Sequence, residues 1–314
     1  MSIIDPVIVF FIIGLIAERS SSGLKIPAAF YETVSIYLLL AIGIKGGIKL
    51  FHTQPSELLL PLLASAAAGI VVTILAWFLA RRIVGVGPDD AVSMAAHYGS
   101  CSAVTYAVVV NELNRAKIVY EPFAAVLLVC LEIAGLMAAV VLARKTCAPT
   151  GHPGASAWRE IFLGKTTILL LGGLVAGYTI AATDQTQMKF FFTDLFKGFL
   201  ALFMLEMGIV TAQRFGELRQ LGLRLTVFAL LMPLLAAGIG MAAASMAGMT
   251  PGGTVILATL CASASYIAAP AVVRMLLPKA NLSLALTASL ALTFPFNILA
   301  GIPLYTAVVG WIRG

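Results

Sequence analysis

Residues 88–111 read PDDAVSMAAHYGSCSAVTYAVVVN, and residues 251–274 read PGGTVILATLCASASYIAAPAVVR. Each stretch begins apolar, passes through a patch of small polar residues and becomes apolar again, although a helix crossing hydrocarbon needs no such patch. Small or Pro-interrupted segments at corresponding positions of two halves indicate the binding site of a secondary transporter. The alternative is a pair of packing helices, because small residues are common at helix contacts in membranes. At an offset of 163 residues the matched pairs are Pro88 with Pro251, Ser100 with Ser263 and Ser102 with Ser265.

The composition is that of a polytopic membrane protein built from helices. Of 314 residues, 61% are hydrophobic and 11% are charged, and the mean hydropathy is +1.02. Apolar runs of about 20 residues cross a bilayer as helices, because unsatisfied backbone groups are too costly in lipid. No cofactor motif is present. We predict ten transmembrane helices, at residues 3–19, 27–47, 57–80, 89–112, 121–143, 160–182, 190–212, 222–247, 252–275 and 282–311.

The basic residues orient these predicted spans. The net charge of +6 lies at helix ends, so it reports membrane topology and not binding to nucleic acid. Of 20 Lys and Arg residues, thirteen fall in or beside the odd-numbered connections. The positive-inside rule then places those connections in the cytoplasm and both termini outside. The even connections and the C-terminus hold the other seven, Lys45, Lys49, Arg115, Lys117, Lys189, Lys197 and Arg313.

The number of spans predicts an inverted repeat. Five spans in residues 1–145 precede a polar cytoplasmic linker at residues 146–159, and five more follow in residues 160–314. Because five is odd, the second half enters the membrane from the opposite side. The matched spans four and nine would therefore cross near the midplane from opposite directions.

Two crossed helices that break at their serine patches would form an ion site. Half-helix N-termini present backbone N–H groups and positive dipole ends to an anion, and the C-terminal carbonyls suit Na⁺. Intramembrane ionisable residues are a second indication of function. Glu132, Glu206 and Asn297 are therefore candidates for a sodium site. The alternative for each glutamate is a structural ion pair or a position at the membrane interface.

An enzyme is the alternative from another class. His97 near the serine patch would suit an intramembrane serine hydrolase, in which histidine activates the nucleophile. The chain lacks H-E-x-x-H and G-x-S-x-G motifs, and the histidine occurs in only one of the two copies. Binding by symmetry explains both copies, so we predict that the protein is not an enzyme. A channel fits less well than ion-coupled transport, because interrupted helices beside a carboxylate are typical of transporters.

Four motifs carry a resemblance that covers nearly the whole chain. Residues 97–105 (HYGSCSAVT), 262–270 (ASASYIAAP), 292–297 (LTFPFN) and 301–305 (GIPLY) closely resemble the sodium-dependent bicarbonate transporter family. The resemblance implies ten spans in two inverted repeats, usually as a homotrimer, that import bicarbonate with Na⁺ across the plasma (inner) membrane. Carried over by position, the anion site comprises Gly99, Ser100, Cys101, Ser102, Ser263, Ala264 and Ser265.

Three departures from the cyanobacterial members bear on this expectation. Tyr266 stands where those members carry an acidic residue, so the sodium site would be rebuilt with Glu132 or Glu206, or the ion or the substrate would differ. Tyr266 and Asn297 are further candidate sodium ligands. Cys101 replaces a typical serine and removes a hydroxyl donor. The central loop is much shorter, so a PII-like regulator would have to dock on other surfaces. The prediction is a Na⁺-coupled symporter of bicarbonate, with another small carboxylate or related anion as the alternative substrate.

Overall fold

The predicted all-α class is confirmed by the computed structural model, which describes residues 5–147, 154–183, 188 and 190–313. Within these ranges there is no β-strand. Part of the predicted linker (148–153) and Lys189 lie outside the described residues. The α-helices are α1 (Pro6–Arg19), α2 (Ala28–Leu50), α3 (Pro55–Leu79), α4 (Pro88–Gly99), α5 (Ala103–Arg115), α6 (Ala124–Thr146), α7 (Gly154–Leu163), α8 (Lys165–Thr183), α10 (Phe196–Met246), α11 (Pro251–Ala262), α12 (Ala268–Leu276), α13 (Leu282–Thr287), α14 (Phe294–Phe296) and α15 (Ile302–Arg313). Four π-helical turns join or extend them, η1 (Ala80–Val84), η2 (Phe190–Asp194), η3 (Ala288–Thr293) and η4 (Asn297–Gly301).

Seven segments among the described residues are long and apolar enough to cross a membrane, which makes the chain a multi-pass membrane protein. The other three predicted spans correspond to α1, which has 14 residues, and to two helix pairs that are each interrupted. Ten spans therefore stay a prediction. The seven segments are Ala28–Leu50, Pro55–Val84, Ala124–Thr146, Ser156–Thr183, Phe190–Glu217, Gly222–Met246 and Leu282–Ile312.

Two predicted boundaries differ from the structure. The predicted helix at 160–182 is two helices, because the chain breaks at Gly164 between α7 and α8. The predicted spans at 190–212 and 222–247 are joined in α10, which bends at Gly222 with φ 82° and ψ 170°. Only glycine adopts this conformation readily, so the residue type explains where the helix bends.

Helix starts follow the local sequence. Proline occupies the first turn of α1, α3, α4 and α11, where its missing N–H costs nothing. The Asp5 carboxylate accepts a hydrogen bond from Val7 N–H at 2.7 Å and caps α1. Thr250 Oγ1 accepts a hydrogen bond from Gly253 N–H at 3.1 Å and caps α11 in the same way.

Glycine residues allow two pairs of helices to pack with their backbones in direct contact. A Cβ on Gly14 of α1 would lie 3.0 Å from the Cα of Gly208 in α10. A Cβ on Gly43 of α2 would lie 2.9 Å from the Cα of Gly173 in α8. Small residues permit such close approach between membrane helices, so these pairs form a rigid frame beside the interrupted helices.

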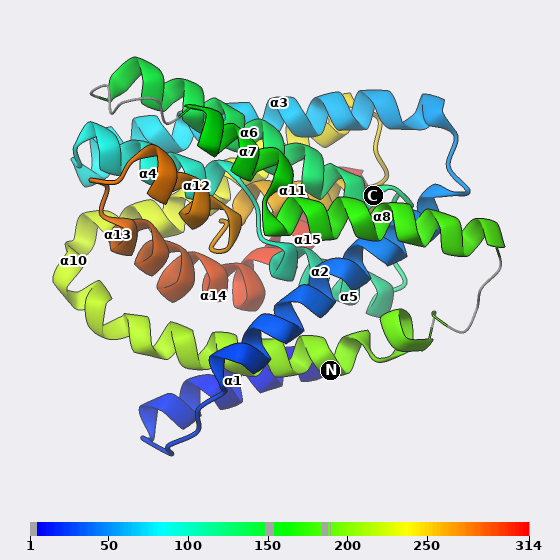
Figure 1. The fold of residues 1–314 in the computed structure, drawn as a ribbon, viewed down its shortest axis with the longest axis horizontal. Helices are drawn as coiled ribbons and strands as arrows, with labels where there is room; N and C mark the ends of the chain where they lie inside the picture. Colours follow the sequence, from blue (N-terminus) through cyan, green and yellow to red (C-terminus); the bar gives the residue numbers. More distant parts are fainter. Residues whose placement is uncertain (1–4, 148–153, 184–187, 189, 314) are drawn as a thin grey trace.

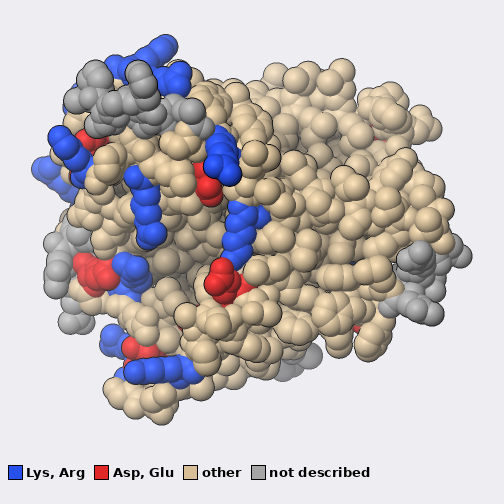
Figure 2. Space-filling model, in the orientation of Figure 1, with Lys and Arg blue, Asp and Glu red and all other residues tan. Residues whose placement is uncertain are grey.

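The connections gather at two ends of the molecule. In Figure 1 the α1–α2, α3–α4 and α12–α13 connections and the bend of α10 lie at the left, and the α2–α3 connection lies at the right. Both chain ends are marked in the right half of that view. On the face shown in Figure 2, Lys and Arg side chains gather at the left and the right half is almost free of them. Which end faces the cytoplasm stays a prediction.

Candidate functional site

The two serine patches interrupt their helices and contact each other. α4 ends at Gly99 and α5 begins at Ala103, while α11 ends at Ala262 and α12 begins at Ala268. The backbone is extended just after each break, with ψ 178° at Ser100 and 173° at Ser263.

Hydrogen bonds join the two breaks directly. Ser102 N–H donates to Ser263 Oγ at 2.9 Å, and Ser265 N–H donates to the His97 carbonyl at 2.7 Å. Segments separated by more than 160 residues are thus held at one crossing, as the matched sequences led us to expect.

A small cavity lies at this crossing, between the first turns of α5 and α12. Its volume is about 10 Å³, which is room for roughly one water-sized body. The N-terminal residues of both helices line it, together with one carboxylate from α6. The lining residues are Leu39, Cys101, Ser102, Ala103, Val104, Glu132, Thr166, Ser265, Tyr266, Ile267 and Ala268.

The first turn of α5 offers backbone donors at the cavity. Ser102 Oγ accepts a hydrogen bond from Thr105 N–H at 3.1 Å, but no residue that the structure describes accepts one from the N–H of Ala103 or Val104. On the other side Ser265 Oγ accepts from Ala269 N–H at 3.2 Å. Free N–H groups and two positive dipole ends favour negative charge at this point.

Two of the four predicted sodium ligands line the cavity at the crossing. Glu132 is only 3% exposed, lines the cavity and forms no ion pair with any described residue. Tyr266 also lines it, and its hydroxyl accepts a hydrogen bond from Ser102 Oγ at 3.0 Å. Thr166 of α8 adds a further oxygen that the sequence analysis missed. A threonine near the start of an apolar helix gives little signal, because its hydroxyl commonly bonds a helix carbonyl.

The other two predicted sodium ligands lie elsewhere. Asn297 holds the end of α11, because its Nδ2 donates to the Ala262 carbonyl at 2.8 Å and its Oδ1 accepts from Tyr305 at 2.9 Å. Glu206 is half-buried in α10 and does not line the cavity. Its Oε2 is buried and has no hydrogen-bond partner among the described residues.

The predicted anion-site residues divide into two groups. Cys101, Ser102 and Ser265 line the cavity, whereas Gly99, Ser100, Ser263 and Ala264 do not. Gly99 packs against Thr73 of α3 and Gly135 of α6, with no space for a side chain. Ser263 Oγ is occupied by the Leu260 carbonyl and Ser102 N–H. These residues therefore shape and brace the crossing. The Ser100 hydroxyl is buried and has no partner among the described residues.

No serine–histidine pair of a hydrolase forms among the described residues. His97 is fully buried, and its Nδ1 lies 2.8 Å from the Ser93 carbonyl. Its Nε2 has no hydrogen-bond partner in the described structure. A histidine that activates a nucleophile must lie within hydrogen-bond reach of it, and this one bonds its own helix instead.

Comparison with known families agrees with this geometry. A model of the Na⁺-dependent bicarbonate transporter superfamily matches residues 6–310, which is nearly the whole chain. No curated protein matched the chain in a separate comparison. The family match covers both serine patches, Glu132 and the Asn297 brace. The chain therefore belongs to the Na⁺-dependent bicarbonate transporter superfamily.

Proposed function

We propose that this protein is a secondary transporter that imports bicarbonate together with Na⁺, and that both ions bind at the crossing of the two interrupted helices. The observation that carries the proposal is the cavity that joins two helix N-termini with the buried Glu132 carboxylate. Another small carboxylate or related anion remains the alternative substrate.

The anion would bind against the helix N-termini. The unpaired N–H groups of Ala103 and Val104 are donors for a carboxylate-like group, and the positive ends of α5 and α12 add favourable charge. The Ser102 and Ser265 hydroxyls lie at the same cavity. Because hydrogen bonds to charged groups are worth about 1.5–3 kcal/mol each, a few such donors can hold a monoanion without a dedicated arginine.

The coupling ion would bind beside Glu132. Na⁺ is a hard cation that prefers oxygen ligands, and the cavity offers the Glu132 carboxylate with hydroxyls from Thr166 and Ser102. A bound cation would also offset the repulsion between Glu132 and the anion, so each ion would favour binding of the other. The present cavity has room for about one small body, so loading both ions requires α5 and α12 to move apart.

We also propose ten spans in two inverted repeats. The helix contacts occur in matched pairs, because α1 packs on α10 while α2 packs on α8. In the first half α3 contacts α4 and α6, and in the second half α10 contacts α11 and η3. This is the pattern that an inverted repeat would give. The Lys and Arg distribution supports external termini and a cytoplasmic linker, and the family resemblance supports a homotrimer in the plasma (inner) membrane.

The intramembrane hydrolase alternative is set aside. The family is one of transporters, so the protein is not an enzyme.

The experiment is uptake of labelled bicarbonate into proteoliposomes, with and without an inward Na⁺ gradient. Ser102→Ala combined with Ser265→Ala should raise the apparent KM roughly tenfold or more, because charged hydrogen bonds are lost. Ser65→Ala is the matched control, since Ser65 is fully buried and donates to the Leu127 carbonyl away from the cavity. Uptake that ignores Na⁺, or equal KM values in the double variant and the control, would contradict the proposal. Competition by formate or acetate in place of bicarbonate would favour the alternative substrate.

A further inference from the structure

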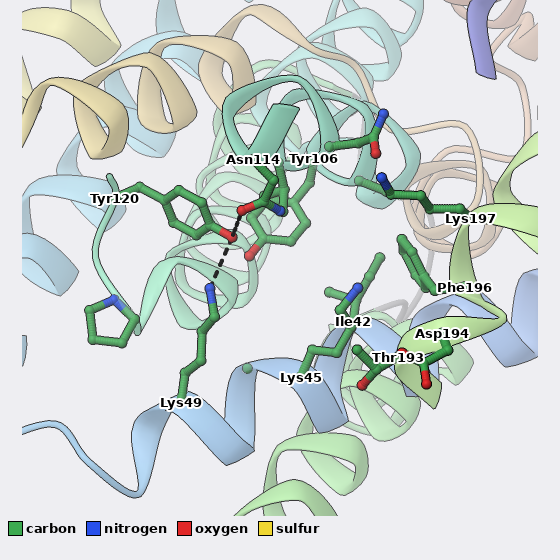
Figure 3. A pocket seen from close by; sticks show the side chains of 15 residues that line it. Ile42, Lys45, Lys49, Tyr106, Asn114, Tyr120, Thr193, Asp194, Phe196 and Lys197 are labelled. Carbon is green, nitrogen blue, oxygen red and sulfur yellow. Dashed lines mark hydrogen bonds between the residues drawn. The ribbon is translucent and has the colours of Figure 1, made fainter. Parts of the chain in front are cut away.

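A large cleft with three lysines opens at one end of the molecule. It has a volume of about 470 Å³ and lies between α2, α5, the start of α10 and the segment before α6. In Figure 3 Lys45 and Lys49 project from α2 into this space, and Lys197 reaches in from α10. Among the lining residues that the structure describes, Asp194 is the only acidic one, so their charged side chains leave a net charge of +2.

Two of the lysines are positioned by aromatic side chains. Lys45 Nζ lies 3.9 Å from the centre of the Phe196 ring, and Lys49 Nζ donates to the Tyr120 hydroxyl at 2.9 Å. None of the three lysines forms an ion pair with any residue that the structure describes. A concave surface of one charge sign concentrates ions of the opposite sign. The cleft is therefore suited to small anions.

Asn111 forms part of the wall between the cleft and the interior of the protein. Asn111 lines the cleft and is 5% exposed, and its Nδ2 donates to the Asp5 carboxylate at 2.8 Å. Its Oδ1 is buried and has no partner among the described residues. An amide oxygen can accept a hydrogen bond only from a donor. Because this oxygen is buried in the wall of the cleft, an anion in the cleft would contact the lysines and not this acceptor.

A third, much smaller cavity lies between the cleft and the crossing, along the seam between α2 and α5. This cavity of about 10 Å³ shares Ile42 and Ala107 with the cleft, and it shares Leu39, Ala103 and Val104 with the cavity at the crossing. The seam is apolar and narrow, so it separates the cleft from the crossing in this conformation.

We propose that the lysine cleft is an anion vestibule, which gathers small anions and supplies them to the crossing through the α2–α5 seam. The proposal rests on the function proposed above for the crossing. The cleft is lined by the α2–α3, α5–α6 and α8–α10 regions, which the charge distribution assigns to the outside of the membrane. The vestibule would thus face the source of the imported ion.

The first measurement tests the electrostatic potential in the cleft independently of transport. Asn114→Cys places a thiol on an exposed residue in the lining. We expect the anionic methanethiosulfonate reagent MTSES to react faster than the cationic MTSET, relative to a free thiol. Adding K45Q, K49Q and K197Q should reduce this preference roughly tenfold, whereas K45R, K49R and K197R should keep it. The chain with only its four native cysteines supplies the background rate.

The second measurement is bicarbonate uptake at low ionic strength. The Gln triple variant should raise the apparent KM about three- to tenfold with unchanged Vmax, and 0.5 M choline chloride should remove the difference by screening. K25Q, K145Q and K279Q form the matched control, since these exposed lysines lie in odd-numbered connections. If the two reagents react equally fast with Asn114→Cys, the cleft does not attract anions and the vestibule proposal is wrong. If the Gln triple variant loses the preference for MTSES but keeps its KM for bicarbonate, the cleft does not supply the crossing. If the chain does not transport bicarbonate at all, the proposed function fails, and the reagent preference still decides whether the cleft attracts anions.

Discussion

Replacing Gly135 by alanine should disturb the crossing from its outer side. Gly135 of α6 packs against the break after α4, and a Cβ there would lie 2.5 Å from the Gly99 carbonyl carbon and closer still to its oxygen. Bringing the carbonyl carbon alone to the 3.4 Å of an ordinary contact requires a separation of about 0.9 Å, and the nearer oxygen requires more. Neither neighbour is a flexible side chain, so the strain cannot be relieved by a rotamer change.

The expected size of this effect follows from two opposing terms. Overpacking of this kind costs about 1–3 kcal/mol, and replacement of a helical glycine by alanine returns about 1 kcal/mol. The net change in unfolding free energy should lie between zero and about 2 kcal/mol. Transport should suffer more, because the strain falls on the native spacing of the crossing. A cost of 1–3 kcal/mol lowers the population of that packing roughly 5- to 150-fold.

The assay compares Na⁺-driven bicarbonate uptake with the thermal unfolding midpoint of each purified variant. Gly238→Ala on α10 is the matched control, since a Cβ there meets nothing within 4 Å. Gly135→Ala should retain most of its thermal stability and lose uptake, whereas the control should keep both. If the two variants transport equally well, the break after α4 tolerates displacement and the argument from its packing is wrong.

Three further predictions concern the sodium site, the topology and a thiol at the end of α6. Glu132→Gln should abolish or strongly weaken the Na⁺ dependence of uptake. Glu206→Gln should leave the Na⁺ dependence unchanged, because Glu206 does not line the cavity. The reverse outcome would show that Glu206, and not Glu132, belongs to the sodium site. A membrane-impermeant maleimide should fail to label Lys25→Cys on intact cells, and labelling from outside would reverse the topology. Burial is the larger cause and hydrogen bonding to Asp89 the smaller cause that together raise the pKa of Cys147 from 9.0 to about 11. Its thiol should therefore stay neutral below that pH and react about 100-fold more slowly near neutrality than an unperturbed thiol. Asp89→Asn should speed this reaction, and an unchanged rate would remove Asp89 as a cause.

The sequence predicted the crossing better than it predicted the role of each residue there. Matching serine patches at a constant offset located both breaks, because a polar interruption in an apolar helix is visible in the sequence. Glu132 was visible for a similar reason, since a carboxylate in an apolar span is costly. The structure places it at the cavity, and its proposed role as a sodium ligand stays a prediction.

Features that depend on tertiary packing could not be predicted. The packing of Gly99 against Thr73 depends on where α3 lies, and α3 carries no motif that announces this contact. Asn297 stood out as polar just as Glu132 did, but only the structure shows that its amide holds the Ala262 carbonyl. The lysine cleft was hidden because its members lie in different connections, where each one counted only as a topology signal.

The hydrogen bonds at the crossing also determine its charge balance. A helix has a negative end as well as a positive one, and α4 and α11 both finish here. The His97 carbonyl accepts a hydrogen bond from Ser265 N–H, and the Ala262 carbonyl accepts one from Asn297 Nδ2. These two oxygens at the negative helix ends are therefore already paired and repel an anion less. The first N–H groups of α5 have no such partner among the described residues. Separating the two helix pairs would free the His97 carbonyl, so the proposed site should hold an anion less tightly in the open conformation that admits it than in the closed one. An anion that enters the open site would then be held more tightly on closure and released on reopening, without protonation of any side chain.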